Sequence, residues 1–115
     1  MDERERRIGL NEAVFREANE ALRGLNEMFA AYTEKMELVC ECADGACAER
    51  ITTSPSEYEE IRSDPALFAI APGHEVAAVE EVVRKREGYD VVRKRAGSAR
   101  RLAEATDPRS SVEET

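Results

Sequence analysis

The segment from Cys40 to Cys47 reads CECADGAC and holds all three cysteines of the 115-residue chain. In an extended segment, residues two apart point to the same side, so Cys40 and Cys42 can project together. The four residues that follow Cys42 favour a turn, because Asp44 can bond to nearby backbone amides and Gly45 accepts positive φ. We expect this turn to return Cys47 towards the first two cysteines.

His74 is the only histidine in the chain, and it follows Pro72 and Gly73. Proline suits the second position and glycine the third position of a type II turn, which would place His74 just after a strand. Three cysteines and one histidine form a tetrahedral structural zinc set with no open position for water. The sequence therefore predicts one metal site, with zinc as the metal, built from four ligands: Cys40, Cys42, Cys47 and His74.

Other uses of these residues stay open, because the C-x-C-x4-C spacing lacks the paired C-x2-C knuckles of strong zinc motifs. Reduced cysteines also pack as small hydrophobic residues. An iron–sulfur cluster of the 2Fe–2S type accepts mixed cysteine and histidine ligands and would be coloured. A disulfide would leave one of the three cysteines over.

The motifs of common enzymes are absent from the sequence. It has no phosphate-binding glycine loop, no H-E-x-x-H motif and no serine elbow. Cys47 and His74 could form a nucleophilic pair, but the other two cysteines would then have no explanation. The sequence therefore predicts a protein that is not an enzyme.

The net charge of −8 argues against nucleic-acid binding by the chain as a whole. Basic residues nevertheless gather between Arg84 and Arg101. Clustered basic residues could contact phosphates or a protein partner, and a tyrosine among them could stack on a base. The candidate contact residues are Arg84, Lys85, Arg86, Tyr89, Arg93, Lys94 and Arg95. Alternatively, these residues balance the acidic long helix within the fold or in a dimer.

The cellular location is predicted from two features that the sequence lacks. The sequence has no basic and apolar leader followed by a cleavage site, and no apolar run near the roughly 20 residues of a membrane span. Clustered cysteines without an export signal favour a metal over disulfides. We therefore expect a cytoplasmic protein that has no contact with a membrane.

Residues 1–36 are predicted to form a long amphipathic helix, beginning near residue 3. A heptad seam recurs at steps of three and four: Ile8, Asn11, Phe15, Ala18, Leu22, Leu25, Phe29, Tyr32 and Met36. This stripe could pack on the chain's own sheet or pair with a second copy. A helix of about 45 Å exceeds what so small a domain can cover, which favours a coiled-coil homodimer through residues 8–36.

Residues 37–106 are predicted to form a small α+β domain that binds the metal. Strands are expected at residues 37–43, 50–53, 67–71 and 89–95. Ser54 and Glu57 have the capping-box spacing with Pro55 at the first helical position, so a short helix should follow and end at Asp64 and Pro65. The overall expectation is a long N-terminal helix, a small sheet with short helices, and a metal site that joins distant segments.

Residues 75–87 are less clear. The spacing of Val76, Val79 and Val83 is helical and predicts a helix that stops at Gly88, although valine lowers helix propensity and leaves a strand possible. A last short helix is expected at residues 98–105. Residues 107–115 are predicted to be a disordered tail.

Several segments resemble a group of small bacterial proteins, mainly actinobacterial. They are residues 11–20 (NEAVFREANE), 40–47 (CECADGAC), 57–62 (EYEEIR) and 68–75 (FAIAPGHE). The likeness runs from the first helix to residues 107–109, and the cysteine cluster with the Pro-Gly-His turn is its most specific part. The resemblance implies a bacterial cytoplasmic protein and brings no activity with it.

Together these patterns predict a non-enzymatic, zinc-stabilised interaction or regulatory module that forms a homodimer and has a possible protein partner. One alternative is a metal- or redox-responsive switch, in which oxidation of Cys40, Cys42 or Cys47 releases the metal. Another is a weak nucleic-acid binder that uses the basic segment 84–101.

Overall fold

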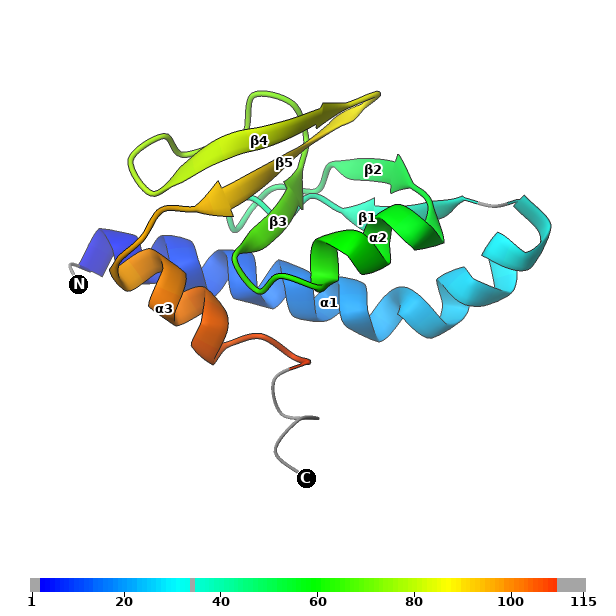
Figure 1. Ribbon diagram of the computed structural model, residues 1–115, viewed down its shortest axis with the longest axis horizontal. Helices are drawn as coiled ribbons and strands as arrows, with labels where there is room; N and C mark the ends of the chain where they lie inside the picture. Colours follow the sequence, from blue (N-terminus) through cyan, green and yellow to red (C-terminus); the bar gives the residue numbers. More distant parts are fainter. Residues whose placement is uncertain (1–2, 34, 110–115) are drawn as a thin grey trace.

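The computed structural model describes residues 3–33 and 35–109 (Figure 1). Its first element is the long predicted helix, α1 (Glu3–Thr33), which runs along the whole length of the molecule beneath the strands. A helix of 31 residues is about 46 Å long, which matches the longest dimension of 45 Å. The predicted helix ended at residue 36, but Met36 already belongs to a strand.

Five strands form two small antiparallel sheets. In the first, β1 (Met36–Val39) pairs with β2 (Arg50–Thr53). In the second, the order is β3-β5-β4, with β3 (Leu67–Ile70), β4 (Glu80–Arg86) and β5 (Tyr89–Lys94). The sheets meet just after β1, where the Glu41 N–H donates to the Ala69 carbonyl oxygen at 2.8 Å. The α+β class is therefore confirmed, and the cysteine segment begins at the junction of the sheets.

Two short helices complete the fold, α2 (Pro55–Arg62) between the sheets in sequence and α3 (Ser98–Ala105) after β5. The predicted start of α2 is confirmed, since Pro55 opens the helix and the Ser54 hydroxyl accepts from the Glu57 N–H at 3.2 Å. The Glu57 carboxylate accepts hydrogen bonds from the hydroxyls of Thr53 and Tyr89. This cap therefore also holds α2 against β2 and β5.

The helix predicted over residues 75–87 is wrong. The chain makes turns up to Val79 and then forms β4, which pairs with β5 along its length. Gly88, expected to stop a helix, lies in the short turn between the two strands with φ of 85°. Adjacent valines suit a pleated strand because their branched side chains pack well there. Cross-strand pairing of Val82 with Val92 outweighed the helical spacing.

The face of α1 that packs on the sheets is not the predicted seam. Glu12, Arg16 and Asn19 are buried, together with Ala13. Among the seam residues, four are only half-buried and Leu22 is 38% exposed. The half-buried ones are Ile8, Asn11, Phe15 and Ala18. Seam residues Leu25, Phe29 and Tyr32 lie outside the side chains that the structure describes, so pairing of α1 with a second copy stays a prediction.

Charged and amide side chains join α1 to the sheets in two places. Beside β1, the buried Glu41 carboxylate accepts from Arg62 Nη2 and from Asn19 Nδ2, each at 2.7 Å. Nearer the N-terminus of the helix, the Lys94 ammonium donates to the carboxylates of Glu12 and Glu80, all three being buried. Buried charges require such partners, because an unpaired charge in the interior is costly.

Arg16 of α1 forms a hydrogen bond to α3. Its guanidinium donates to the carbonyl oxygens of Pro65 and Ala103 at 2.6 and 2.7 Å and lies 4.4 Å from the centre of the Phe68 ring. Arg109, in the predicted tail, donates to the carboxylates of Glu20 and Glu59. The part of that tail before residue 110 is therefore ordered, and residues 110–115 lie outside the described residues.

Candidate metal centre

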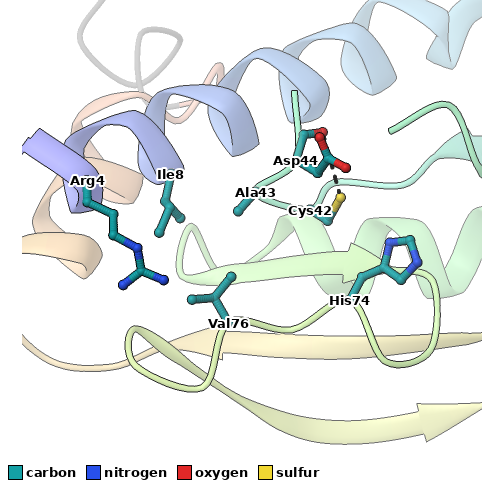
Figure 2. A pocket seen from close by; sticks show the side chains of 7 residues that line it. All are labelled: Arg4, Ile8, Cys42, Ala43, Asp44, His74 and Val76. Carbon is teal, nitrogen blue, oxygen red and sulfur yellow. Dashed lines mark hydrogen bonds between the residues drawn. The ribbon is translucent and has the colours of Figure 1, made fainter. Parts of the chain in front are cut away.

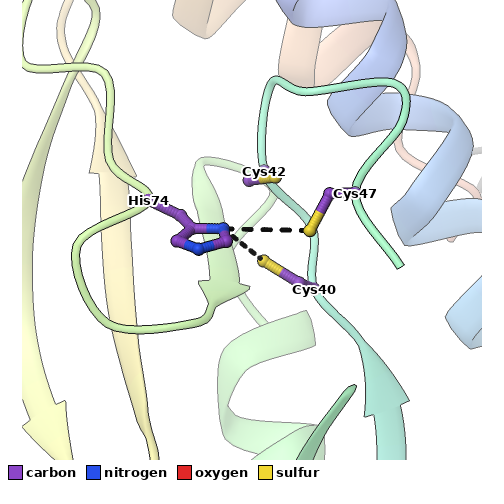
Figure 3. A group of neighbouring side chains, drawn as sticks. All are labelled: Cys40, Cys42, Cys47 and His74. Carbon is purple, nitrogen blue, oxygen red and sulfur yellow. Dashed lines mark hydrogen bonds between the residues drawn. The ribbon is translucent and has the colours of Figure 1, made fainter. Parts of the chain in front are cut away.

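The four predicted ligands come together between the two sheets. Their donor atoms all lie within 4.8 Å of one another. Nδ1 of His74 is 3.6 Å from Cys40 Sγ and 3.8 Å from Cys47 Sγ (Figure 3). A tetrahedral zinc ion with ordinary bond lengths places a nitrogen and a sulfur ligand about 3.5 Å apart. The predicted convergence is confirmed, and the group could hold one metal ion.

The backbone after β1 places the three cysteines as the sequence predicted. Cys40 and Cys42 are buried on one side of the chain, and Glu41 between them points to the other side, into the contact with Arg62. The turn then forms, with Cys47 N–H donating to the Asp44 carbonyl oxygen at 3.0 Å. The Asp44 carboxylate also accepts from the Ala46 N–H at 2.9 Å.

A second turn, after β3, brings in the histidine. His74 N–H donates to the Ala71 carbonyl oxygen at 3.1 Å, and Gly73 has φ of 85°, as expected for a type II turn. The Ala71 N–H donates to Cys40 Sγ at 3.1 Å. This last bond joins the two loops of the site and favours the negatively charged form of the sulfur.

Burial disfavours free thiolates in the cluster. Removal from water raises the pKa of Cys40 and Cys42, and the nearby Cys47 raises both further. Thiolates are nevertheless the form that binds a metal, and a bound divalent cation inverts this balance by deprotonating the thiols outright. The site is therefore suited to sulfur ligands that lose their protons when a cation binds.

An open pocket of about 450 Å³ borders the cluster (Figure 2). Cys42 and His74 line one part of it, and Arg4 and Ile8 of α1 line another. In Figure 2 the Arg4 side chain extends into this pocket towards Val76. The pocket exposes one side of the cluster, whereas Cys40 is enclosed at the junction of the sheets.

The candidate contact residues of the basic segment lie mostly beside acidic partners. Their ion pairs are Arg84 with Glu60, Arg86 with Glu57, Arg93 with Asp64, Arg95 with Glu81, and Lys94 with Glu12 and Glu80. Lys85 is exposed on β4. Tyr89 and Lys94 are buried, so their side chains lie inside the domain. These contacts balance the basic residues within the fold, although of these pairs only that of Lys94 with Glu12 involves the long helix. Nucleic-acid binding stays a prediction.

Sequence reasoning missed two features around the cluster. One is Glu41, which links it to α1 and α2 through Asn19 and Arg62. The other is Glu49, whose Oε2 lies 3.7 Å from His74 Nε2. Glutamates are common in this sequence, so neither stood out. The only available signal was position, inside or just after the cysteine segment.

The chain was compared with known proteins in three ways, and no protein-family model, curated protein or solved structure matches it. In the part of the chain that the structure describes, no helix has both the length and the apolar character needed to cross a membrane. The function must therefore be argued from the cluster itself.

Proposed function

We propose that Cys40, Cys42, Cys47 and His74 bind one zinc ion, and that the chain is a non-enzymatic, zinc-stabilised interaction or regulatory module. The supporting observation is the convergence of all four donor atoms within 4.8 Å of one another. Such spacing suits one tetrahedral ion. A 2Fe–2S cluster is less well suited, because its ligands are divided between two iron atoms.

Zinc at this position would act on folding. Three ligands belong to the loop that joins β1 to β2, and the fourth belongs to the loop that joins β3 to β4. One ion would therefore tie the two sheets together across a long separation in sequence. Four protein ligands leave no open position for water or substrate, which supports a structural site and not a catalytic one.

A redox-responsive switch is the second candidate function. Cys47 is only half-buried, and Cys42 and His74 border the open pocket. Small oxidants could reach these sulfurs, and oxidation would remove the thiolates on which metal binding depends. The two candidates differ in lability: a structural site keeps its zinc through mild peroxide and chelator, and a switch loses it reversibly.

The proposal includes a homodimer through α1. Leu10 and Val14, which lie outside the predicted seam, are exposed on the side of the helix away from the sheets, with 63% of Val14 accessible. Exposed apolar residues at this helical spacing suit pairing with another helix. A second copy of the chain is present in any solution of the protein, and it is therefore the partner that we propose for this face.

The test is elemental analysis and absorption spectroscopy of protein purified without added metal. We expect one zinc per chain in a colourless sample, and at least about tenfold weaker zinc binding when His74 is replaced by Ala. Visible absorption would point to iron, and a folded protein with no metal would contradict the proposal. Light scattering on the same sample should give the mass of two chains.

A further inference from the structure

The two ring nitrogens of His74 face different partners. Nδ1 faces the cluster, 3.6 Å from Cys40 Sγ and 3.8 Å from Cys47 Sγ, as the dashed lines in Figure 3 show. Nε2 faces the carboxylate of Glu49, with Oε2 at 3.7 Å. Only Nδ1 can therefore bind an ion held by the sulfurs, and Nε2 must then carry the ring proton.

Glu49 is attached to the same loop as the three cysteines. Its carbonyl oxygen accepts from the Cys40 N–H at 2.9 Å, which closes the loop directly before β2. His74 comes from the other loop, after β3. The contact between Glu49 and His74 thus spans the same two loops that the metal would join, on the opposite edge of the imidazole ring.

We propose that Glu49 is a positioning residue for His74. Its carboxylate attracts the Nε2–H group and so keeps the Nδ1 lone pair directed at the ion. Histidines that bind metals almost always donate their other ring N–H to a carboxylate, a backbone carbonyl or water, and loss of such a partner weakens metal binding about 10- to 100-fold. This inference rests on the proposed zinc site.

The contact is partly open to water, which sets the size of the expected effect. The side chains of Glu49 and His74 are 61% and 30% exposed. Exposed charge pairs are weak because water and salt screen them. The separation of 3.7 Å is also slightly longer than a direct hydrogen bond. We therefore expect an effect near the lower end of the range, about tenfold.

The experiment compares zinc affinity, measured by competition with a chromophoric chelator, in three variants. Glu49→Ala should bind zinc about tenfold more weakly than the wild type. The zinc affinity of Glu49→Gln should lie between that of Glu49→Ala and that of the wild type. The matched control is Glu37→Gln, because Glu37 lies on the same hairpin and pairs with Arg50 at 2.6 Å. The control should bind zinc like the wild type.

A second readout separates positioning from a general loss of structure. In the zinc-loaded wild type, the proton on His74 Nε2 should give an NMR signal that reports the nearby Glu49 carboxylate, because the negative charge shifts it downfield. Glu49→Gln should move that signal upfield while the backbone amide signals stay in place. If both Glu49 variants keep wild-type affinity, the inference fails and the zinc site stands. If the wild type binds no zinc, both fail.

Discussion

Two regions of this protein bury polar groups, and they do so in opposite ways. In the cysteine cluster, three sulfurs and an imidazole nitrogen converge, and only a cation can join them. In the contact between α1 and the sheets, hereafter the polar interface, each buried polar side chain already has at least one hydrogen-bond partner in the chain. Its residues are Glu12, Asn19, Glu41, Arg62, Glu80 and Lys94. The first region should depend on a ligand for its stability, and the second should not.

Glu41 shows how close the two regions lie. It stands between Cys40 and Cys42 in sequence, yet its side chain turns away from the sulfurs to Arg62 and Asn19. The segment Cys-Glu-Cys thus supplies ligands on one side and the centre of the polar interface on the other. Alternation along an extended chain explains both roles. The difference between the regions can therefore be tested by substitutions made on either side of one backbone segment.

The largest expected effect lies in the polar interface. Arg62→Met keeps much of the side-chain volume but leaves the Glu41 carboxylate buried without its opposite charge. Breaking a buried pair in this way costs about 3–5 kcal/mol of the free energy of unfolding. Urea unfolding should show this loss equally in zinc-loaded and chelator-treated protein.

Arg50→Met is the matched control for that substitution. Arg50 also pairs with a glutamate, Glu37 at 2.6 Å, but 70% of its side chain is exposed. Exposed pairs contribute about 0–1 kcal/mol, so the control should change stability little. Equal losses of unfolding free energy in Arg62→Met and Arg50→Met would show that burial does not determine how much an ion pair stabilises this protein.

The cluster should show the second largest effect, and only in the presence of metal. When free zinc is about 100 times its dissociation constant, binding stabilises the folded state by about 2.7 kcal/mol. Cys47→Ser should lose most of that gain, because the half-buried Cys47 supplies one of four ligands. After chelation the variant and the wild type should unfold at nearly the same urea concentration. A loss that persists after chelation would mean that Cys47 acts through packing.

The cluster was predictable because its signals are rare residues. One histidine and three cysteines leave few ways to combine them, and turn formers such as Asp44, Gly45 and Gly73 stand between or before them. Both turns form, the first closed by hydrogen bonds to Asp44 and the second with Gly73 at positive φ, whereas Gly45 does not adopt positive φ. The contact between Glu49 and His74 was not predictable, since it depends on where a second loop places His74.

The fold was predictable where local preference and tertiary pairing agree, as at Pro55 in α2 and along β3 and β5. The prediction failed where local preference and tertiary pairing compete. At β4 the helical spacing of valines lost to pairing with β5. On α1 the apolar stripe was expected to pack on the sheet or on a second copy, but the face that packs on the sheets buries Arg16 and Asn19. Their hydrogen-bond partners lie far away in sequence, at Ala103 and Val39, so no local pattern could reveal them.

The third expected effect concerns pH and builds up gradually. Burial, with repulsion from the Glu80 carboxylate, outweighs the attraction of Lys94 and raises the pKa of Glu12 to about 9. The folded state then keeps a proton that the unfolded chain releases above about pH 4.5, so this group's stabilisation falls as pH rises towards 9. The free energy of unfolding should therefore fall by at most about 1.4 kcal/mol per pH unit through this group.

Glu12→Gln tests this directly, because glutamine keeps the neutral shape and cannot titrate. Between about pH 6 and pH 8, the stability of chelator-treated wild type should decline more steeply than that of the variant, while the other titrating groups cancel in the comparison. Parallel curves would mean that Glu12 is ionised in the folded protein. Lys94 would then face two ionised carboxylates, and this part of the polar interface would carry one uncompensated negative charge.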